Sequence, residues 1–368
     1  MVRYQERIYF KYSFFLSFLV GRHLANHTDL VRPFLNGTNR YALDGVIETV
    51  AGLTGDGTAI IDHVTADIEA KLAKFSQYYV PFEFDPMSKA EWLQNAAEEA
   101  MWATISQEVE KGPVSASELD LIRGSFSREA RTYDQEVRYS QLRELEFEIF
   151  AAASILRQAL KASHGVSGSV KKRAIIACLR VYQVAMQIGT IQAREIAKRD
   201  WFQWGGVIFI GFNRASNEGN DEQTNSTAII TNIPTSVTMQ AAEDFGSRKL
   251  GQAFKAMIST QDPESFMSLL LFGCMIRTKP SQWEECALDR IAKIGRKAFY
   301  LSGILRILMK EYKTGINTIQ ERQSLRRLIS TVHAKRSHSK AMPGARLVRN
   351  MMNRLEDKGI LDASTKIR

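Results

Sequence analysis

One stretch of the sequence combines residue types that bind phosphate groups with a complete lack of acids. Residues 169–200 read SVKKRAIIACLRVYQVAMQIGTIQAREIAKRD, and no Asp or Glu occurs between Glu148 and Glu195. Soluble helices usually mix both signs, because Glu–Lys pairs one turn apart stabilise the helix and keep its exposed face soluble. A long acid-free stretch therefore indicates a surface that meets something negatively charged.

Placed on a helix at about 100° per residue, this stretch separates a basic row from an apolar face. The apolar face contains Ala174, Cys178, Val181, Ala185 and Ile196. Guanidinium groups hold two phosphate oxygens at once, whereas an ammonium group provides a mobile point charge. The phosphate-binding candidates on this helix are Lys171, Lys172, Arg173, Arg180, Gln187, Arg194 and Lys198.

Further basic groups follow along the chain, with aromatic residues between them. The downstream candidates are Arg248, Lys249, Lys255, Arg277, Lys279, Lys293, Arg296 and Lys297. Phe254, Trp283, Phe299 and Tyr300 could stack on bases, although aromatic residues at helical spacing are more often part of a core. If these segments face the basic helix, they line one groove for a repetitive phosphate backbone, such as single-stranded nucleic acid.

The charge of the chain is distributed unevenly. Of its 368 residues, 45% are hydrophobic and 24% are charged, which are ordinary values for a globular protein, and the net charge is +9. Residues 1–160 carry 16 Lys and Arg against 23 Asp and Glu, a net −7, and residues 161–368 carry 33 against 17, a net +16. These counts indicate an acidic first half and a basic second half that attracts a polyanion.

Other kinds of chemistry find little support in the sequence. The glycine-rich segment Gly52–Thr58 lacks the Gly-Lys-Ser/Thr ending of a phosphate loop, so a surface turn is expected there. Cys178, Cys274 and Cys286 show no metal or disulfide spacing and suit a reducing compartment. The apolar run near the N-terminus is too short to span a bilayer. We expect no enzyme, no metal, no cofactor and no membrane partner.

The elements that must position these residues are mainly helices. Four capping boxes, in which a Ser or Thr is followed three residues later by Glu, begin at Ser88, Ser115, Ser281 and Thr318. The box at Ser281 is expected to open one helix that runs to the residues before Gly315. Two segments rich in β-branched and aromatic residues, 205–212 and 227–239, predict strands joined by a polar loop, with Pro234 placing the second at an edge.

The predicted fold class is therefore a mainly α, two-lobed protein with a small β-hairpin near the lobe junction and extended arms. Residues 1–28 are expected to form an N-terminal arm or first helix, and residues 29–240 an N-terminal lobe with the hairpin at about 205–239. Residues 241–342 are expected to form a C-terminal helical lobe, and residues 343–368, which include the helix ARLVRNMMNRLEDKG, a C-terminal arm.

This layout resembles the nucleoproteins of negative-strand RNA viruses. The resemblance covers the whole chain and rests on the order of aromatic N-terminus, basic middle and detached C-terminal helix. The small nucleoproteins of fungal mononegaviruses fit the length best. The resemblance does not rest on a motif. The Phe-x4-Tyr and Ser-x-Ala-Met-Gly pattern of the paramyxovirus branch is absent, and the segment RKAFYLSGILRI is only weakly similar to that pattern.

The resemblance implies a protein that encloses single-stranded genomic RNA in a basic cleft between lobes, without reading its sequence. It implies a homo-oligomeric ring or filament, a viral polymerase or phosphoprotein-like chaperone as partner, and a place in the virion or in host-cytoplasmic ribonucleoprotein. Arms that reach neighbouring subunits make their apolar residues the expected oligomer contacts. These residues are Tyr9, Phe10, Phe14, Phe15, Phe18, Leu347, Met351 and Leu355.

Two other classes of protein remain open from the sequence. The coat protein of a flexuous filamentous RNA virus is also helical, basic and filament-forming, but it builds filaments of fixed diameter. A cellular helical scaffold or an unrecognised enzyme would instead be free of nucleic acid and small in mass.

Overall fold

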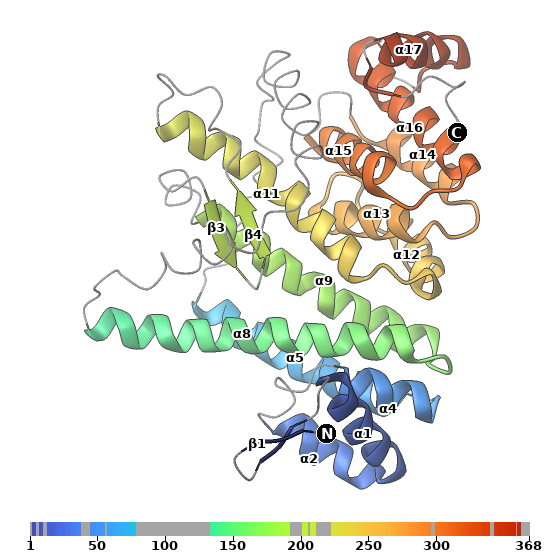
Figure 1. The fold of residues 1–368 in the computed structure, drawn as a ribbon. Helices are drawn as coiled ribbons and strands as arrows, with labels where there is room; N and C mark the ends of the chain where they lie inside the picture. The colour runs from blue at the N-terminus through green and yellow to red at the C-terminus, as the bar shows by residue number, and fades with distance from the viewer. Residues whose placement is uncertain are drawn as a thin grey trace.

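The computed structural model describes residues 2–4, 7–9, 13–37, 45–55, 57–78, 133–191, 201–204, 207–210, 222–295, 299–338, 342–357 and 359–361. Within these residues the protein is mainly helical, as the sequence predicts (Figure 1). The expected helices around Ser88 and Ser115 lie outside the described residues.

At one end of the molecule, α4 (Val46–Thr54) packs against α1 (Ser13–Asn26) and the long α8 (Tyr133–Ala162). Here α1 crosses α4 closely, because Gly21 has no side chain where a Cβ would lie 2.6 Å from that of Thr49. The short helices η1 (Thr28–Leu30) and α2 (Val31–Asn36) follow α1, and α5 (Thr58–Tyr78) follows α4. Between α4 and α5, Gly55 has a φ of 71°, so the Gly52–Thr58 segment contains a turn, as expected.

The acid-free stretch forms α9 (Gly168–Ile191), which lies between the N-terminal helices and the rest of the chain. It packs against α5 and α8 on one side and against α11 (Glu222–Asp244) and α13 (Phe266–Thr278) on the other. Gly189 allows a close approach to α11, since a Cβ there would lie 3.2 Å from the Ile233 side chain. The helix continues past this glycine to Ile191, and the expected extension over residues 192–200 lies outside the described residues.

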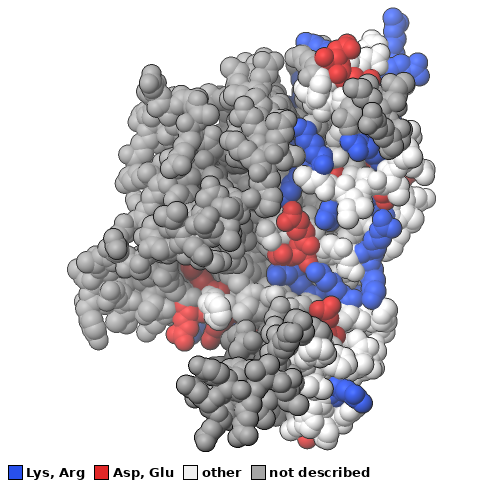
Figure 2. Space-filling view, viewed as in Figure 1, with Lys and Arg blue, Asp and Glu red and all other residues white. Residues whose placement is uncertain are grey.

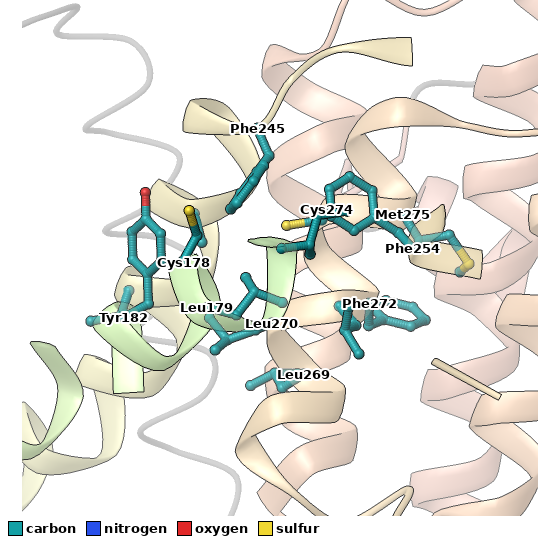
Figure 3. Close-up of a cluster of buried hydrophobic side chains, with 14 of the residues drawn as sticks. Cys178, Leu179, Tyr182, Phe245, Phe254, Leu269, Leu270, Phe272, Cys274 and Met275 are labelled. Atoms are coloured by element: carbon teal, nitrogen blue, oxygen red, sulfur yellow. The ribbon is translucent and has the colours of Figure 1, made fainter. Parts of the chain in front are cut away.

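The C-terminal helices bury one continuous apolar core together with α9. The helices are η2 (Arg248–Leu250), α12 (Gly251–Ile258), α14 (Trp283–Lys293), α15 (Phe299–Thr314), α16 (Ile319–His338) and α17 (Ala345–Asp357). Figure 3 shows Cys178 and Leu179 of α9 facing the α13 side chains. Phe245 and Phe254 meet edge to face, with 5.5 Å between ring centroids. Such burial is the main source of stability for helices of this kind.

The predicted hairpin over residues 205–239 is wrong, because its second strand is helical. Residues 227–239 lie inside α11, and Pro234 is within that helix. Ile233, Val237 and Ala241 are buried at four-residue spacing against neighbouring helices. The burial of this face outweighs the β preference of the branched residues. The short antiparallel pairs that the structure describes are β1 (Val2–Tyr4) with β2 (Arg7–Tyr9) and β3 (Trp201–Trp204) with β4 (Val207–Ile210).

One expected capping box is present and another is not. The Thr318 hydroxyl accepts a hydrogen bond from the Glu321 backbone N–H at 3.2 Å, and the Glu321 carboxylate accepts one from the Thr318 backbone N–H at 2.8 Å. The box predicted at Ser281 is wrong, because Gln282 is the N-cap residue of α14 and has a left-handed φ of 59°. The single long helix expected there is two helices, α14 and α15.

The C-terminal helix is not detached in the described structure. α17 packs on α16, and Arg326 of α16 forms an ion pair with Glu356 of α17. Met351 and Leu355 are 7% and 3% exposed. The prediction of these two residues as oligomer contacts on a free arm is therefore wrong: they belong to the core of their own chain.

Candidate nucleic-acid interface

The described part of α9 has the predicted apolar face, but little of the predicted basic face is exposed. Ala174, Cys178, Val181 and Ala185 are buried, whereas Arg173 and Arg180 on the opposite side are exposed. Burial raises the pKa of the Cys178 thiol to about 12, so this cysteine belongs to the core. The exposed basic residues of the described helix are Lys172, Arg173 and Arg180, and the lack of acids elsewhere reflects burial on several sides.

The basic row meets a row of acids on α5. Arg173 forms two hydrogen bonds with Glu69, from Nε at 3.1 Å and from Nη2 at 2.5 Å. The bond from Arg173 holds the pKa of Glu69 below its ordinary value, and the positive charges of Arg173 and Arg180 lower it further. Asp62 also lies within electrostatic reach of Arg173. Part of the positive charge of α9 is therefore neutralised within the chain.

The first turn of α9 is basic and contains no acid. Lys172 is exposed, Lys171 is half-buried, and the Ser167 hydroxyl accepts a weak hydrogen bond from Val170 N–H at 3.4 Å. The amino end of a helix carries partial positive charge and favours anions. Lysines at this end therefore add to a field that attracts a negative ligand. Farther along, Gln187 is half-buried, and the candidates Arg194 and Lys198 lie outside the described residues.

The connection between α8 and α9 brings in a basic residue from η2. Lys249 donates a hydrogen bond to the Lys161 carbonyl at 3.3 Å, and its Nζ lies 3.1 Å from Nε2 of His164. Burial and the charge of Arg157 lower the pKa of Lys161. Arg248 beside it is 78% exposed and has Glu321 at 3.7 Å. Lys249 thus contacts residues 161–164, which lead directly into the first turn of α9. We call residues 161–164, 171–172 and 248–249 the elbow cluster.

A buried polar group fixes the helices behind the elbow cluster. Arg157 of α8 donates a hydrogen bond to the Tyr182 hydroxyl at 2.9 Å, and that hydroxyl donates to Asp244 of α11. Gln240 donates to the other Asp244 oxygen at 3.0 Å. Burial raises the pKa of Tyr182 well above its ordinary value. These bonds tie α8, α9 and α11 together, so the elbow cluster has a rigid base.

The candidates on α12 and α14 form a second basic area. Lys255 donates to the Ser281 carbonyl at 3.0 Å and to the Gln282 side chain at 2.8 Å, and exposed Lys293 pairs with Asp289 at 2.7 Å. Their charges both act on the half-buried Cys286 between them. Arg296 and Lys297 lie outside the described residues.

Two candidates are structural in the described protein. The Lys279 side chain is only 5% exposed and forms an ion pair with buried Glu311, which Arg277 also contacts at 3.1 Å. A buried ammonium held by a carboxylate does not reach a ligand on the surface, so predicting Lys279 as a phosphate contact is wrong. Arg277 is partly exposed but shares the same partner.

Three of the four aromatic residues near these groups are buried and not available for stacking on bases. Phe254, Tyr300 and Trp283 are 0%, 3% and 9% exposed, so the core interpretation holds for all three. The side chain of Phe299 lies outside the described part. Figure 2 shows basic side chains distributed over the described face with acidic groups between them. The face therefore offers basic groups that can contact phosphates. None of the predicted aromatic residues whose side chains are described is exposed enough to stack on a base.

The N-terminal oligomer candidates differ in how far they are described. Phe15 and Phe18 of α1 are 46% and 43% exposed. Leu347 of α17 is half-buried. The side chains of Tyr9, Phe10 and Phe14 lie outside the described part.

Sequence reasoning missed three residues that shape this surface: Glu69, His164 and Glu311. Each lies far along the chain from the cation that it meets. A signal existed only for Glu69, since Asp62 and Glu69 are seven residues apart, like Arg173 and Arg180. Equal spacing on two helices of opposite charge indicates that the rows can face each other.

Among the described residues, no group of three or more His, Cys, Asp or Glu side chains is placed to hold a metal ion. None of the described helices has the length and hydropathy needed to cross a membrane. Comparisons with known protein families, with curated proteins and with solved structures find no match.

Proposed function

We propose that this protein is an RNA-coating nucleoprotein of the kind found in negative-strand RNA viruses. The observation that carries the proposal is the acid-free amino end of α9, with exposed Lys172, next to which Lys249 from a distant part of the chain contacts the connection from α8. The helices before and after α9 act as two lobes, and single-stranded RNA crosses their junction over this basic surface.

Such a surface binds RNA through its backbone. Phosphates contact Lys172, Arg248 and Lys249 and are attracted by the amino end of α9. Because the contacts are charges rather than base edges, binding is independent of sequence. The aromatic N-terminus mediates assembly with neighbouring copies, and a chaperone-like partner keeps newly made protein free of RNA. The assembled ribonucleoprotein belongs to the virion and to the cytoplasm of the host, and no catalytic activity is part of the proposal.

The test is the composition of the protein purified at moderate salt without added nuclease. We expect an absorbance ratio at 260 and 280 nm dominated by nucleic acid, resistance of that nucleic acid to RNase, and rings or clefted filaments in negative stain. Filaments of fixed diameter with protected RNA would favour a flexuous coat protein instead. A small, monodisperse particle without nucleic acid at both low and moderate salt would overturn the proposal, because phosphate contacts strengthen as salt falls.

A further inference from the structure

One contact of the elbow cluster joins a lysine to a histidine rather than to an acid. Lys249 Nζ lies 3.1 Å from Nε2 of His164, and it donates a longer hydrogen bond to the Lys161 carbonyl at 3.3 Å. An ammonium group can only donate hydrogen bonds, so Nε2 must accept this one and carries no proton. His164 is therefore the neutral ring with its proton on Nδ1.

Both partners of this contact are held in place by their neighbours in the chain. The Gly165 backbone N–H, next to His164, donates a hydrogen bond to the Gly55 carbonyl at 3.2 Å. Leu250, next to Lys249, is fully buried. The backbone thus keeps the two nitrogens close together, while both side chains are exposed to solvent.

The charges around this contact are mainly positive. The cations of the elbow cluster and its base are Arg157, Lys161, Lys171, Lys172 and Arg248, and the acids on the adjoining elements are Glu48, Asp244 and Glu321. These acids act on Lys161 and Arg248. Neither His164 nor Lys249 has a carboxylate partner among the described residues. A second positive charge beside Lys249 is therefore unfavourable until an anion lies next to both groups.

We propose that His164 takes up a proton from the buffer when the elbow cluster binds a phosphate of RNA. The proposal rests on the proposed function and names a regulation of the same site. Once both nitrogens carry protons, Nε2 and Nζ no longer bond to each other, and a phosphate oxygen accepts a hydrogen bond from each. Linkage is reciprocal, so a phosphate that favours the protonated ring binds more tightly as pH falls. Because imidazoles titrate between about pH 5 and 8, this regulation operates near physiological pH.

The test is the affinity of the full chain for a short labelled single-stranded RNA, measured by fluorescence anisotropy at constant salt. Uptake of one full proton changes an affinity by at most about ten-fold per pH unit. We therefore expect the unmodified protein to gain about 3–10-fold more affinity than His164→Gln as pH falls from about 8 to about 6. His164→Lys has a permanent charge, so its affinity should be high and nearly independent of pH.

A matched control replaces a histidine elsewhere on the surface. His27 is exposed just after α1 and contacts the His23 carbonyl, so His27→Gln should keep the pH dependence of the unmodified protein. Far-UV circular dichroism verifies that each variant is folded. If the unmodified protein and His164→Gln gained the same affinity, the proposal would be overturned while the proposed function stands. Absence of RNA binding at every pH would overturn both.

Calorimetry counts the proton directly. The heat of RNA binding, measured near neutral pH in two buffers with different enthalpies of ionisation, gives the number of protons that the complex takes up. We expect the unmodified protein to take up a measurable part of one proton, and His164→Gln to take up less. Equal uptake by the two proteins would contradict the proposal even where their affinities differ, because the variant lacks the ring that binds the proton.

Discussion

The elbow cluster makes a quantitative prediction about salt. In the triple variant Lys172→Gln, Arg248→Gln, Lys249→Gln, three exposed cations become neutral without a change in the buried core. Because all three side chains are on the surface, the variant should fold normally. Its affinity for single-stranded RNA should fall, and so should the dependence of that affinity on salt.

The magnitude follows from counterion release. Each phosphate neutralised on a single strand contributes about 0.7 to the slope of log affinity against log salt. Loss of three such contacts should lower the slope by about 2. Between 50 and 200 mM salt, the unmodified protein should therefore lose about 20-fold more affinity than the variant loses. Fluorescence anisotropy of a labelled RNA that is too short to bridge two copies measures both slopes.

A matched control separates local contacts from net charge. Arg22→Gln, Arg32→Gln, Arg349→Gln also removes three exposed cations, from α1, α2 and α17. Its slope should stay close to that of the unmodified protein. If the two triple variants showed the same slope, the affinity would depend only on overall charge, and the reasoning that places RNA at the elbow cluster would be refuted.

Two further predictions concern stability. Lys335 is 1% exposed and donates to the Ile291 carbonyl, which is buried, and to the Ala292 carbonyl, which is partly buried, at 2.6 and 2.8 Å. Lys335→Met leaves the buried acceptor unpaired and should lower the free energy of unfolding by about 1–3 kcal/mol in urea titrations. An unchanged urea midpoint would show that these carbonyls find other partners. Because Arg173 lowers the pKa of Glu69, their pair stabilises the fold above the ordinary pKa of Glu69, and this contribution is lost as pH falls through the lowered value. The thermal midpoint of Arg173→Gln should therefore lie below that of the unmodified protein at pH 7 and converge with it in acid, whereas a pH-independent difference would contradict the assignment.

The parts of the fold that the sequence predicts are those set by local periodicity. α9 was expected from its apolar spacing, and Cys178 and Val181 are indeed fully buried opposite Arg180. The Thr318 capping box was predictable because its two hydrogen bonds join residues three apart. In both cases the neighbours that determine the structure lie within the same short segment.

The parts that the sequence does not predict depend on distant neighbours. The β-branched residues of α11 form a helix because Ile233 and Val237 bury one face against other helices, and no local signal shows those helices. Lys279 and Glu311 lie 32 residues apart, so a buried ion pair is indistinguishable in the sequence from two surface charges. The same holds for Met351, whose burial depends on where α17 packs.

These long-range pairs also change the path that RNA is expected to take. The sequence alone places the strand along the whole row from Arg173 to Lys198. In the structure, Arg173 is already paired with Glu69, and Arg180 lies within electrostatic reach of the same carboxylate, so this part of the row attracts phosphate less strongly than its charge count implies. At the elbow cluster, Arg248 has Glu321 at the longer distance of 3.7 Å, and Lys249 contacts a carbonyl and an imidazole without a carboxylate partner among the described residues. We therefore expect RNA to cross the amino end of α9 rather than to follow the length of the helix.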